Sequence, residues 1–255
     1  MSMNPQDGSS RPTIVLVHGA FADASSWNGV IERLQAEGVQ VTAPANPLRG
    51  ISIDSAYINS YLDQIPGPVL AVGHSYGGAV ITNAATNANN VVGLVYVCAF
   101  APDEGETLGE VAGDSKDSVL STAQVPLQYP TGEGNETAVE FAVDPEKFHD
   151  AFAADLPEKQ SAVMAATQRP VSELAFSEPN DEPAWKKLPS WAVMAKGDKA
   201  AGTDIVRSMA KRAGATITEV EGSHVIMVSQ PQVVAEAILS AVSATPRKED
   251  LRAGQ

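Results

Sequence analysis

The sequence predicts an α/β protein built on a doubly wound, mostly parallel sheet, and three observations support this fold class. Short apolar runs rich in β-branched residues alternate with segments whose apolar residues recur at helical spacing. The chain has 255 residues, of which 44% are hydrophobic, which is enough for one large core. Several polar residues that could carry chemistry follow a predicted strand directly, where parallel sheets bind their ligands.

The first hundred residues follow this alternation closely, and we assign residues 12–100 to the core. Strands are predicted at Thr13–Val17, Val39–Ala43, Val69–Gly73 and Val91–Cys98. Helices are predicted around Trp27–Leu34, over Ser52–Leu62 and directly after Ser75. The first helix has Asp23 or Ser25 as its N-cap and ends at Gly38.

The alternation stops between about Ala101 and Pro189, in a stretch rich in alanine, proline and acidic residues. A long insert in an otherwise regular chain is typical of a functional cap. We therefore predict a helical cap at residues 101–189, directly before the acid-bearing strand. Its helical pieces are expected at Thr137–Phe141, Pro145–Ala153 and Pro157–Gln168.

The alternation resumes after the insert, so residues 190–244 complete the predicted core. Strands are expected at Ser190–Ala195 and Ala215–Val220, with helices at Thr203–Ala213 and Pro231–Val242. Residues 1–11 and 245–255 are polar or charged, and we expect both to be mobile tails.

The nucleophile candidate is Ser75, in the sequence Gly73-His-Ser75-Tyr-Gly77 at the end of an apolar run. Such a sequence predicts a sharp strand-to-helix turn that holds the serine hydroxyl clear of the sheet. Glycine is needed at 73 and 77 because side chains there would collide with neighbouring elements. The pentapeptide alone is common by chance, so it needs a base, an acid and oxyanion donors beside it.

The general base is predicted to be His224, one of four histidines. It follows the last strand on a glycine-containing loop that can reach back to Ser75. His74 is adjacent to Ser75 and should point away from the hydroxyl. His149 lies in the insert on what resembles an exposed helix, and His18 is better placed to brace the loop after the first strand.

The orienting acid is predicted to be Asp198, which follows a buried strand and is flanked by Gly197. Asp204 is the alternative, but it falls at the start of a helix, where capping or the helix dipole would explain an acidic residue. The oxyanion donors are expected to be the backbone N–H groups of Tyr76 and Ala20, with Phe21 as the alternative to Ala20.

The substrate pocket is expected beside this edge of the sheet, with His18 and four aromatic residues of the insert as its lining. A plain cap core would account for the same aromatic residues, so both interpretations stay open. The four are Phe148, Phe152, Phe176 and Trp185.

Composition narrows the class of partner. The net charge of −14 argues against nucleic acid and anionic membranes as partners. No apolar run approaches twenty residues, and the first eleven residues lack a signal-peptide pattern. The single cysteine, Cys98, is expected to be a buried small apolar residue and fits a reducing cytoplasm. No metal-spaced Cys/His cluster or phosphate-binding glycine loop is present, so no metal or cofactor is expected.

With these residues in place, the chain resembles the α/β-hydrolase superfamily along nearly its whole length. The residues that carry the resemblance are Val15-Leu-Val-His18-Gly19-Ala20-Phe21, Gly73-His-Ser75-Tyr-Gly77-Gly78 and Gly222-Ser-His224. They are similar to a branch of small, cofactor-free enzymes that includes plant methylesterases, hydroxynitrile lyases and bacterial carboxylesterases of the pyrethroid-hydrolase type. The resemblance implies the chain order nucleophile, acid, base and hydrolysis of a small-molecule carboxylic ester through an acyl-enzyme.

Two positions discriminate within this branch. Hydroxynitrile lyases carry a lysine directly after the catalytic histidine and a threonine in the slot of Gly19, whereas this chain has Val225 and Gly19. The lyase is therefore disfavoured. A ligand-binding or receptor-like homologue with a vestigial triad remains the alternative to an esterase, because the fold alone does not give function. No feature of the sequence sets an oligomeric state.

Overall fold

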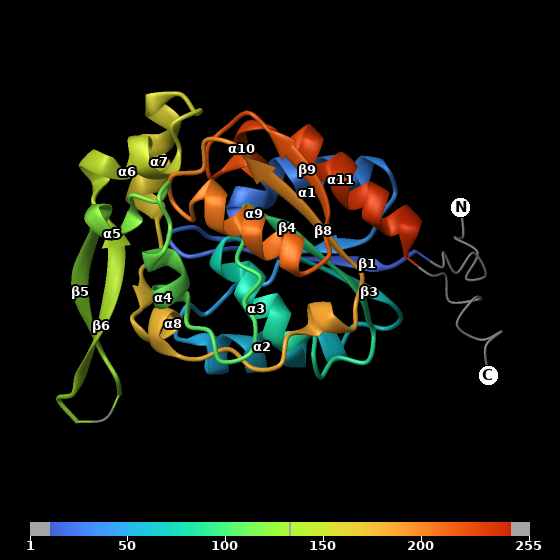
Figure 1. The fold of residues 1–255 in the computed structure, drawn as a ribbon, viewed down its shortest axis with the longest axis horizontal. Helices are drawn as coiled ribbons and strands as arrows, with labels where there is room; N and C mark the ends of the chain where they lie inside the picture. The colour runs from blue at the N-terminus through green and yellow to red at the C-terminus, as the bar shows by residue number, and fades with distance from the viewer. Residues whose placement is uncertain (1–10, 133, 246–255) are drawn as a thin grey trace, which may run out of the picture.

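A parallel sheet forms the centre of the part of the chain that the computed structural model describes, residues 11–132 and 134–245 (Figure 1). Within those residues the sheet has six strands, in the spatial order β2 (Val41–Thr42), β1 (Thr13–Val17), β3 (Val69–His74), β4 (Val91–Val97), β8 (Ser190–Ala195) and β9 (Thr216–Val220). Every neighbouring pair is parallel, so all carboxyl ends meet at one edge. The predicted α/β fold class is confirmed.

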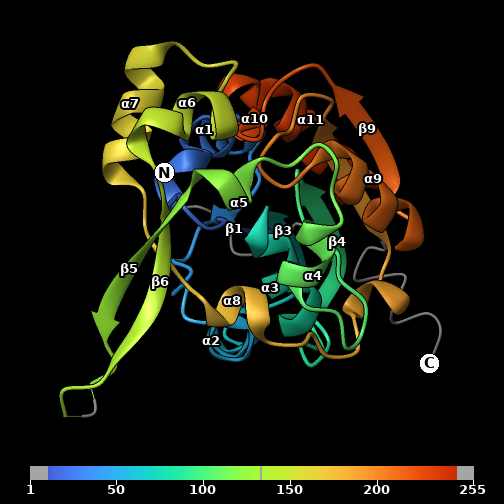
Figure 2. The ribbon, with the colours of Figure 1, turned by 60° about the vertical axis from the view of Figure 1, so that its left-hand side comes forward.

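Helices cover both faces of the sheet. The reason is that the chain adds β2 on one side of β1 and then returns to add β3, β4, β8 and β9 on the other side, and crossovers between parallel strands are right-handed. On one face α1 (Asn28–Ala36) packs against α11 (Pro231–Ala244). The short helix η1 (Ala24–Trp27) leads into α1, and α10 (Ile226–Ser229) leads into α11. On the other face α2 (Ile51–Asp63) packs against α3 (Tyr76–Ala84), as Figure 2 shows. The crossover helix between β8 and β9 is α9 (Thr203–Arg212).

The insert between β4 and β8 lies at the edge where the strands end (Figure 1). Its elements are α4 (Leu108–Gly113), α5 (Leu120–Ala123), β5 (Gln124–Pro130), β6 (Thr137–Val143), α6 (Pro145–Phe152), α7 (Glu158–Thr167), β7 (Val171–Ser172), α8 (Leu174–Ser177) and η2 (Ala184–Lys186). Strands β5, β6 and β7 form a second, antiparallel sheet, and the β5–β6 hairpin projects away from the body (Figure 2). The insert therefore mixes strands with helices.

One helical prediction in the insert is wrong. Residues Thr137–Phe141 belong to strand β6, which pairs antiparallel with β5 over its full length. The physical reason is a period of two: Thr137, Val139, Phe141 and Val143 are β-branched or aromatic and share one face of the strand. The helices predicted from Pro145 and Pro157 are confirmed as α6 and α7, both begun at or next to a proline.

Two other predictions concern the edge of the sheet and the ends of the chain. The strand predicted over Val39–Ala43 is reduced to the two residues of β2 at the edge of the sheet. The predicted tails lie outside the described residues apart from Arg11 and Thr245. Within the described residues, no helix has the length and apolar character needed to cross a bilayer.

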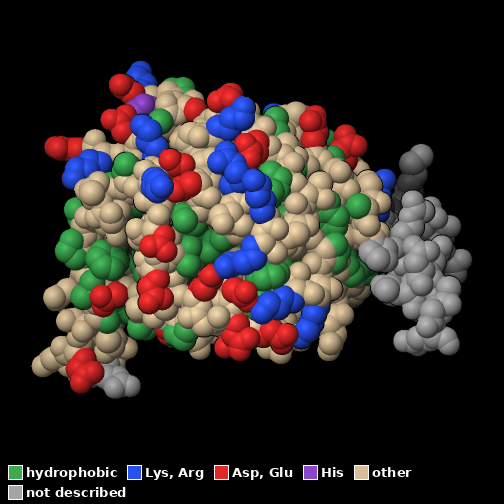
Figure 3. Space-filling model, in the orientation of Figure 1, with side chains coloured by type: hydrophobic (Ala, Val, Ile, Leu, Met, Phe, Trp, Pro, Cys, Tyr) green, Lys and Arg blue, Asp and Glu red, His purple; other side chains and the backbone are tan. Residues whose placement is uncertain are grey.

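The face drawn in Figure 3 carries basic and acidic side chains in mixture, not a continuous basic surface. Several basic and acidic side chains of the described residues form ion pairs, such as Arg207 with Glu219 at 2.7 Å and Lys186 with Asp103 at 2.7 Å.

Candidate active site

Ser75 stands at the turn between β3 and α3, in a backbone conformation that side chains rarely adopt. Its φ is +53° and its ψ is −124°. Such a conformation is strained by about 1–3 kcal/mol and persists only where the surroundings impose it. The surroundings are tight: a Cβ on Gly73 would lie 2.5 Å from the Gly77 carbonyl oxygen, and a Cβ on Gly77 would meet the Val17 carbonyl. The glycines at 73 and 77 allow this close approach.

His224 and Asp198 are paired at the same edge of the sheet. The His224 Nδ1 lies 2.9 Å from Asp198 Oδ2, and both side chains are buried. The other carboxylate oxygen of Asp198 accepts from the amides of Ala200 and Ala201, at 2.9 and 3.0 Å. An acceptor-only carboxylate opposite Nδ1 puts the proton on Nδ1 and leaves Nε2 as the basic nitrogen.

The alternative acid, Asp204, has other partners. It stands in the first turn of α9 and accepts from the Ser115 hydroxyl at 2.6 Å and from the Lys116 amide at 2.8 Å. These bonds attach the insert to α9, so Asp198 is the carboxylate that pairs with His224.

The Ser75 hydroxyl makes no hydrogen bond to the His224 imidazole among the described residues. Catalytic hydrogen bonds of this kind are often long before substrate is bound, and they tighten in the complex. The two residues are nevertheless connected, because His74, the residue before Ser75, bonds to the backbone of His224.

The amides near Ser75 differ in whether they already have an acceptor. The Phe21 N–H donates to the carbonyl of Arg169 in the insert at 3.2 Å. Within the described residues the amides of Ala20 and Tyr76 have no such acceptor. Tyr76 is the first residue of α3, where backbone N–H groups lack intrahelical partners and the helix dipole is positive.

His18 uses both ring nitrogens within the protein. Its Nδ1 lies 2.9 Å from the Gly19 carbonyl oxygen, and its Nε2 accepts from the amide of Asn46 at 2.9 Å. Burial lowers the pKa of His18 to about 4, so the ring is neutral at physiological pH. Both observations describe a brace for the loop that follows β1, with no ring nitrogen left for a substrate.

One of the four predicted aromatic residues, Phe152, packs on His224, and a second, Phe148, packs on Phe152. The Phe152 ring is 4.8 Å from the His224 ring, and Phe148 is 4.9 Å from Phe152. Phe21 joins them from the core, at 6.1 Å from Phe152. These rings form an apolar wall on the insert side of His224.

The other two aromatic residues have different neighbours. Phe176 packs on Phe141 at 6.2 Å, within the insert. The Trp185 indole donates to the Pro102 carbonyl at 2.9 Å, and the Arg212 guanidinium lies 5.9 Å from its ring. Among the ring contacts of the described residues, neither aromatic side chain reaches His224.

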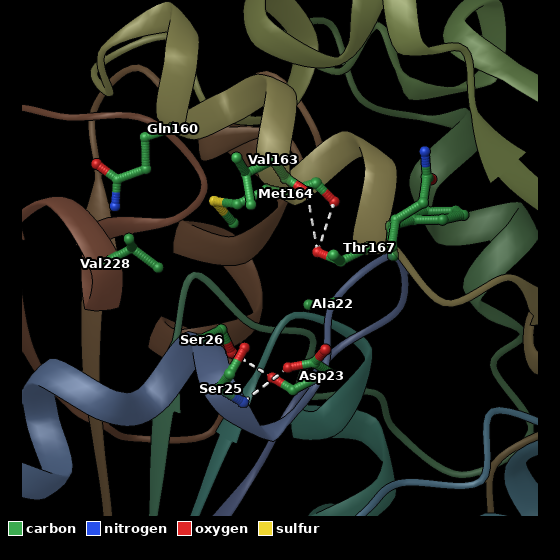
Figure 4. A pocket seen from close by; sticks show the side chains of 11 residues that line it. Ala22, Asp23, Ser25, Ser26, Gln160, Val163, Met164, Thr167 and Val228 are labelled. Atoms are coloured by element: carbon green, nitrogen blue, oxygen red, sulfur yellow. Dashed lines mark hydrogen bonds between the residues drawn. The ribbon is translucent and has the colours of Figure 1, made fainter.

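A cleft of about 210 Å³ lies between the insert and the loop after β1 (Figure 4). Figure 4 shows Val163 and Met164 of α7 across the cleft from Asp23 and Ser25. Phe21 also lines it, so the cleft begins one residue after Ala20. Sequence reasoning missed this cleft because its two walls are about 140 residues apart and the α7 wall carries no motif.

Sequence reasoning also missed a buried carboxyl group behind the turn that carries Ser75. Asp54 of α2 accepts from the Tyr76 hydroxyl at 2.8 Å and from the Arg49 amide at 3.0 Å. Burial raises the pKa of Asp54, although these hydrogen bonds oppose the rise. The only local signal was an acidic residue in the first turn of a helix, which the helix dipole explains by itself.

Comparisons with known proteins agree with this architecture. Residues 14–237 match the model of the alpha/beta hydrolase family, and the chain therefore belongs to that family. It is 25% identical over 240 residues to a pyrethroid hydrolase from Sphingobium wenxiniae, covering 88% of this chain and 85% of the relative. A carbendazim hydrolyzing esterase from Nocardioides sp. is 32% identical over 107 residues, which cover 37% of this chain and 44% of the relative.

Solved structures show the same fold. The crystal structure of polyneuridine aldehyde esterase matches with a TM-score of 0.76 at 20% identity, over 91% of this chain and 99% of that one. A pyrethroid hydrolase structure matches with a TM-score of 0.70 at 22% identity, over 91% and 98% of the two chains. The predicted resemblance to the α/β-hydrolase superfamily is confirmed, and these relatives are named as hydrolases and esterases.

Proposed function

We propose that this α/β hydrolase is a serine esterase that cleaves a small-molecule carboxylic ester through an acyl-enzyme. Ser75 is the nucleophile, His224 the general base and acid, and Asp198 the orienting acid. The observation that carries the proposal is the buried Asp198–His224 pair, at the same sheet edge as a serine with positive φ.

The first half of the reaction forms the acyl-enzyme. Ser75 Oγ attacks the ester carbonyl carbon while His224 Nε2 takes the hydroxyl proton, and Asp198 stabilises the imidazolium. The C–O bond to the alcohol then breaks, and His224 returns its proton to the departing alkoxide oxygen. In the second half, water attacks the acyl carbon while His224 takes its proton. The bond from the acyl carbon to Ser75 Oγ then breaks, and His224 returns the proton to Oγ, which releases the carboxylic acid and restores Ser75.

The negative charge on the tetrahedral oxygen needs preorganised donors. We assign them as the backbone N–H groups of Ala20 and Tyr76. The bond from the Phe21 amide to Arg169 supports Ala20 over Phe21, because the Phe21 amide already has an acceptor. The N-terminal end of α3 adds a positive dipole at the same place.

Residues 101–189 are proposed to be the substrate cap. Phe148 and Phe152 form the apolar wall nearest the base, and the cleft between α7 and the loop after β1 takes a further part of the substrate. In this assignment Phe176 and Trp185 support the cap, and His18 supports the Ala20 loop.

Covalent labelling tests the proposal. A fluorophosphonate probe should label Ser75 at a stoichiometry near one, and p-nitrophenyl acetate should be hydrolysed with burst kinetics if deacylation is slow. Labelling without turnover of any ester in a panel of acyl lengths would favour the binding or receptor-like alternative. Absence of both labelling and turnover would refute the serine esterase.

A further inference from the structure

His74 is a buried titratable residue that the reaction described above does not use. It is the last residue of β3, directly before Ser75, and it is fully buried. Its Nε2 lies 3.0 Å from the backbone carbonyl oxygen of His224. A carbonyl oxygen only accepts, so the ring proton is on Nε2 and the bond runs from His74 to the backbone of the base.

The rings of the two histidines also pack together. Their centroids are 4.6 Å apart, with the planes inclined by 50°. The Trp27 ring also packs near His74, edge-on at 6.3 Å. Burial and the neighbouring His224 lower the pKa of His74 well below the usual value of 6.5, so the ring stays neutral beside the imidazolium that forms on His224.

His74 makes this contact with one nitrogen unpaired. Within the described residues its Nδ1 is buried with no hydrogen-bond partner. It faces Gly19, where an added Cβ would lie 3.1 Å from Nδ1 and 2.7 Å from the Ser75 Cβ. A buried unpaired acceptor is unfavourable, and an aliphatic side chain of similar size would avoid it. What the imidazole adds here is its Nε2–H donor.

We propose that His74 is a positioning residue, which holds the loop of His224 in register with Ser75. The inference rests on the proposed function in that His224 acts as the base. Because His74 is covalently joined to Ser75 and hydrogen-bonded to His224, it connects the nucleophile to the base without touching the reacting atoms. Asp198 orients the imidazole from Nδ1, while His74 sets the position of the backbone that carries it.

Two matched substitutions test the donor. His74→Gln places an amide nitrogen near the position of Nε2, whereas His74→Asn reaches only the position of Nδ1. We expect His74→Asn to lower kcat for p-nitrophenyl acetate about tenfold with KM unchanged, and His74→Gln to recover most of that loss. Tyr96→Phe is the control: Tyr96 lies on β4, next to the strand of His74, and the substitution removes a buried hydrogen bond to Thr82 at 2.8 Å. It should leave kcat within about twofold.

A second readout is independent of turnover. The His224 Nδ1–H that bonds to Asp198 should give a low-field proton resonance, and we expect it to broaden or move in His74→Asn but to persist in His74→Gln. Equal kcat values and equal spectra for the two variants would overturn the proposal, because packing alone would then account for His74. Absence of ester turnover and probe labelling in the unmodified protein would instead refute the esterase, while the resonance would still report on His74.

Discussion

The two sides of the candidate site are held by different kinds of contact. On the core side, Asp198 accepts from two backbone amides and from His224, and the Ser75 amide donates to the Val97 carbonyl at 3.2 Å. On the insert side, Phe152 reaches His224 through ring contacts, and Asp155 bonds to the side chain of Ser223. On the core side, backbone groups hold both Asp198 and Ser75, whereas the insert reaches His224 and Ser223 through side chains, which substitutions can exchange. Under the proposed mechanism, the core side therefore suits the reaction and the insert side suits specificity.

The largest loss of activity that this comparison predicts comes from removing the proposed nucleophile. Ser75→Ala should reduce kcat by at least about 10³-fold while leaving the thermal unfolding transition near that of the unmodified protein. The matched control is Ser190→Ala, a buried serine at the start of β8, which should retain normal turnover. More than about a tenth of normal turnover in Ser75→Ala would show that another group attacks the ester.

The acid comes next. Asp198→Asn should lower kcat by about 10²- to 10⁴-fold, because an amide opposite Nδ1 favours the wrong imidazole tautomer. Asp204→Asn is the control: its carboxylate bonds to Ser115 and Lys116, so its loss should weaken the attachment of the insert more than it slows the reaction. A greater loss of kcat in Asp204→Asn would reverse the assignment of the acid.

On the core side, the buried His18 should make the free energy of unfolding depend on pH. The pKa of His18 is about 4 in the folded chain against 6.5 for an unperturbed histidine, so below pH 6.5 the unfolded chain takes up the proton first. The free energy of unfolding should therefore fall between pH 6.5 and 4, by about 3 kcal/mol from this residue, and be flat in this respect above pH 6.5. Urea unfolding of His18→Gln should show a shallower fall, and an identical slope in both proteins would contradict the cause.

The smallest effect concerns the insert side. Phe152→Leu should change the ratio of kcat/KM between a butyrate and an acetate ester about tenfold, while the acetate rate changes little, because in the proposed pocket the removed atoms would face non-reacting parts of the substrate. Phe141→Leu removes a similar ring that packs on Phe176 instead, so it serves as the control. An unchanged ester ranking in Phe152→Leu would remove the aromatic wall from the pocket.

Local patterns were enough to place most of the core. The β-branched run at Thr13–Val17 and the apolar run at Ser190–Ala195 are strands with the expected bounds. The rule that carboxyl ends of parallel strands share an edge then brought Asp198 and His224 to one place from residues 26 apart. Their roles in catalysis stay predictions that the substitutions above address.

Non-local contacts explain what the sequence left undetermined. The period of two in Thr137–Val143 fits a strand, but so short a segment becomes a strand only because it pairs with β5. The same holds for the aromatic residues of the insert. Phe152 and Phe176 look equivalent in the chain, yet only the former packs on His224, because that choice depends on how α6 and α8 meet the core.

The bond between the Phe21 amide and the Arg169 carbonyl bears on the order in which the insert closes and the ester is cleaved. Arg169 lies between α7 and β7, and its guanidinium also donates to the Asn46 carbonyl at 3.1 Å. The insert is therefore hydrogen-bonded to Phe21, in the loop that His18 braces, and to Asn46, whose amide bonds to the His18 ring. If the insert swings away to admit a bulky ester, it must either break these bonds or drag the Ala20 loop with it. Under the proposed mechanism, an open conformer would then lack a well-formed cradle for the tetrahedral oxygen, and ester cleavage would begin only after reclosure.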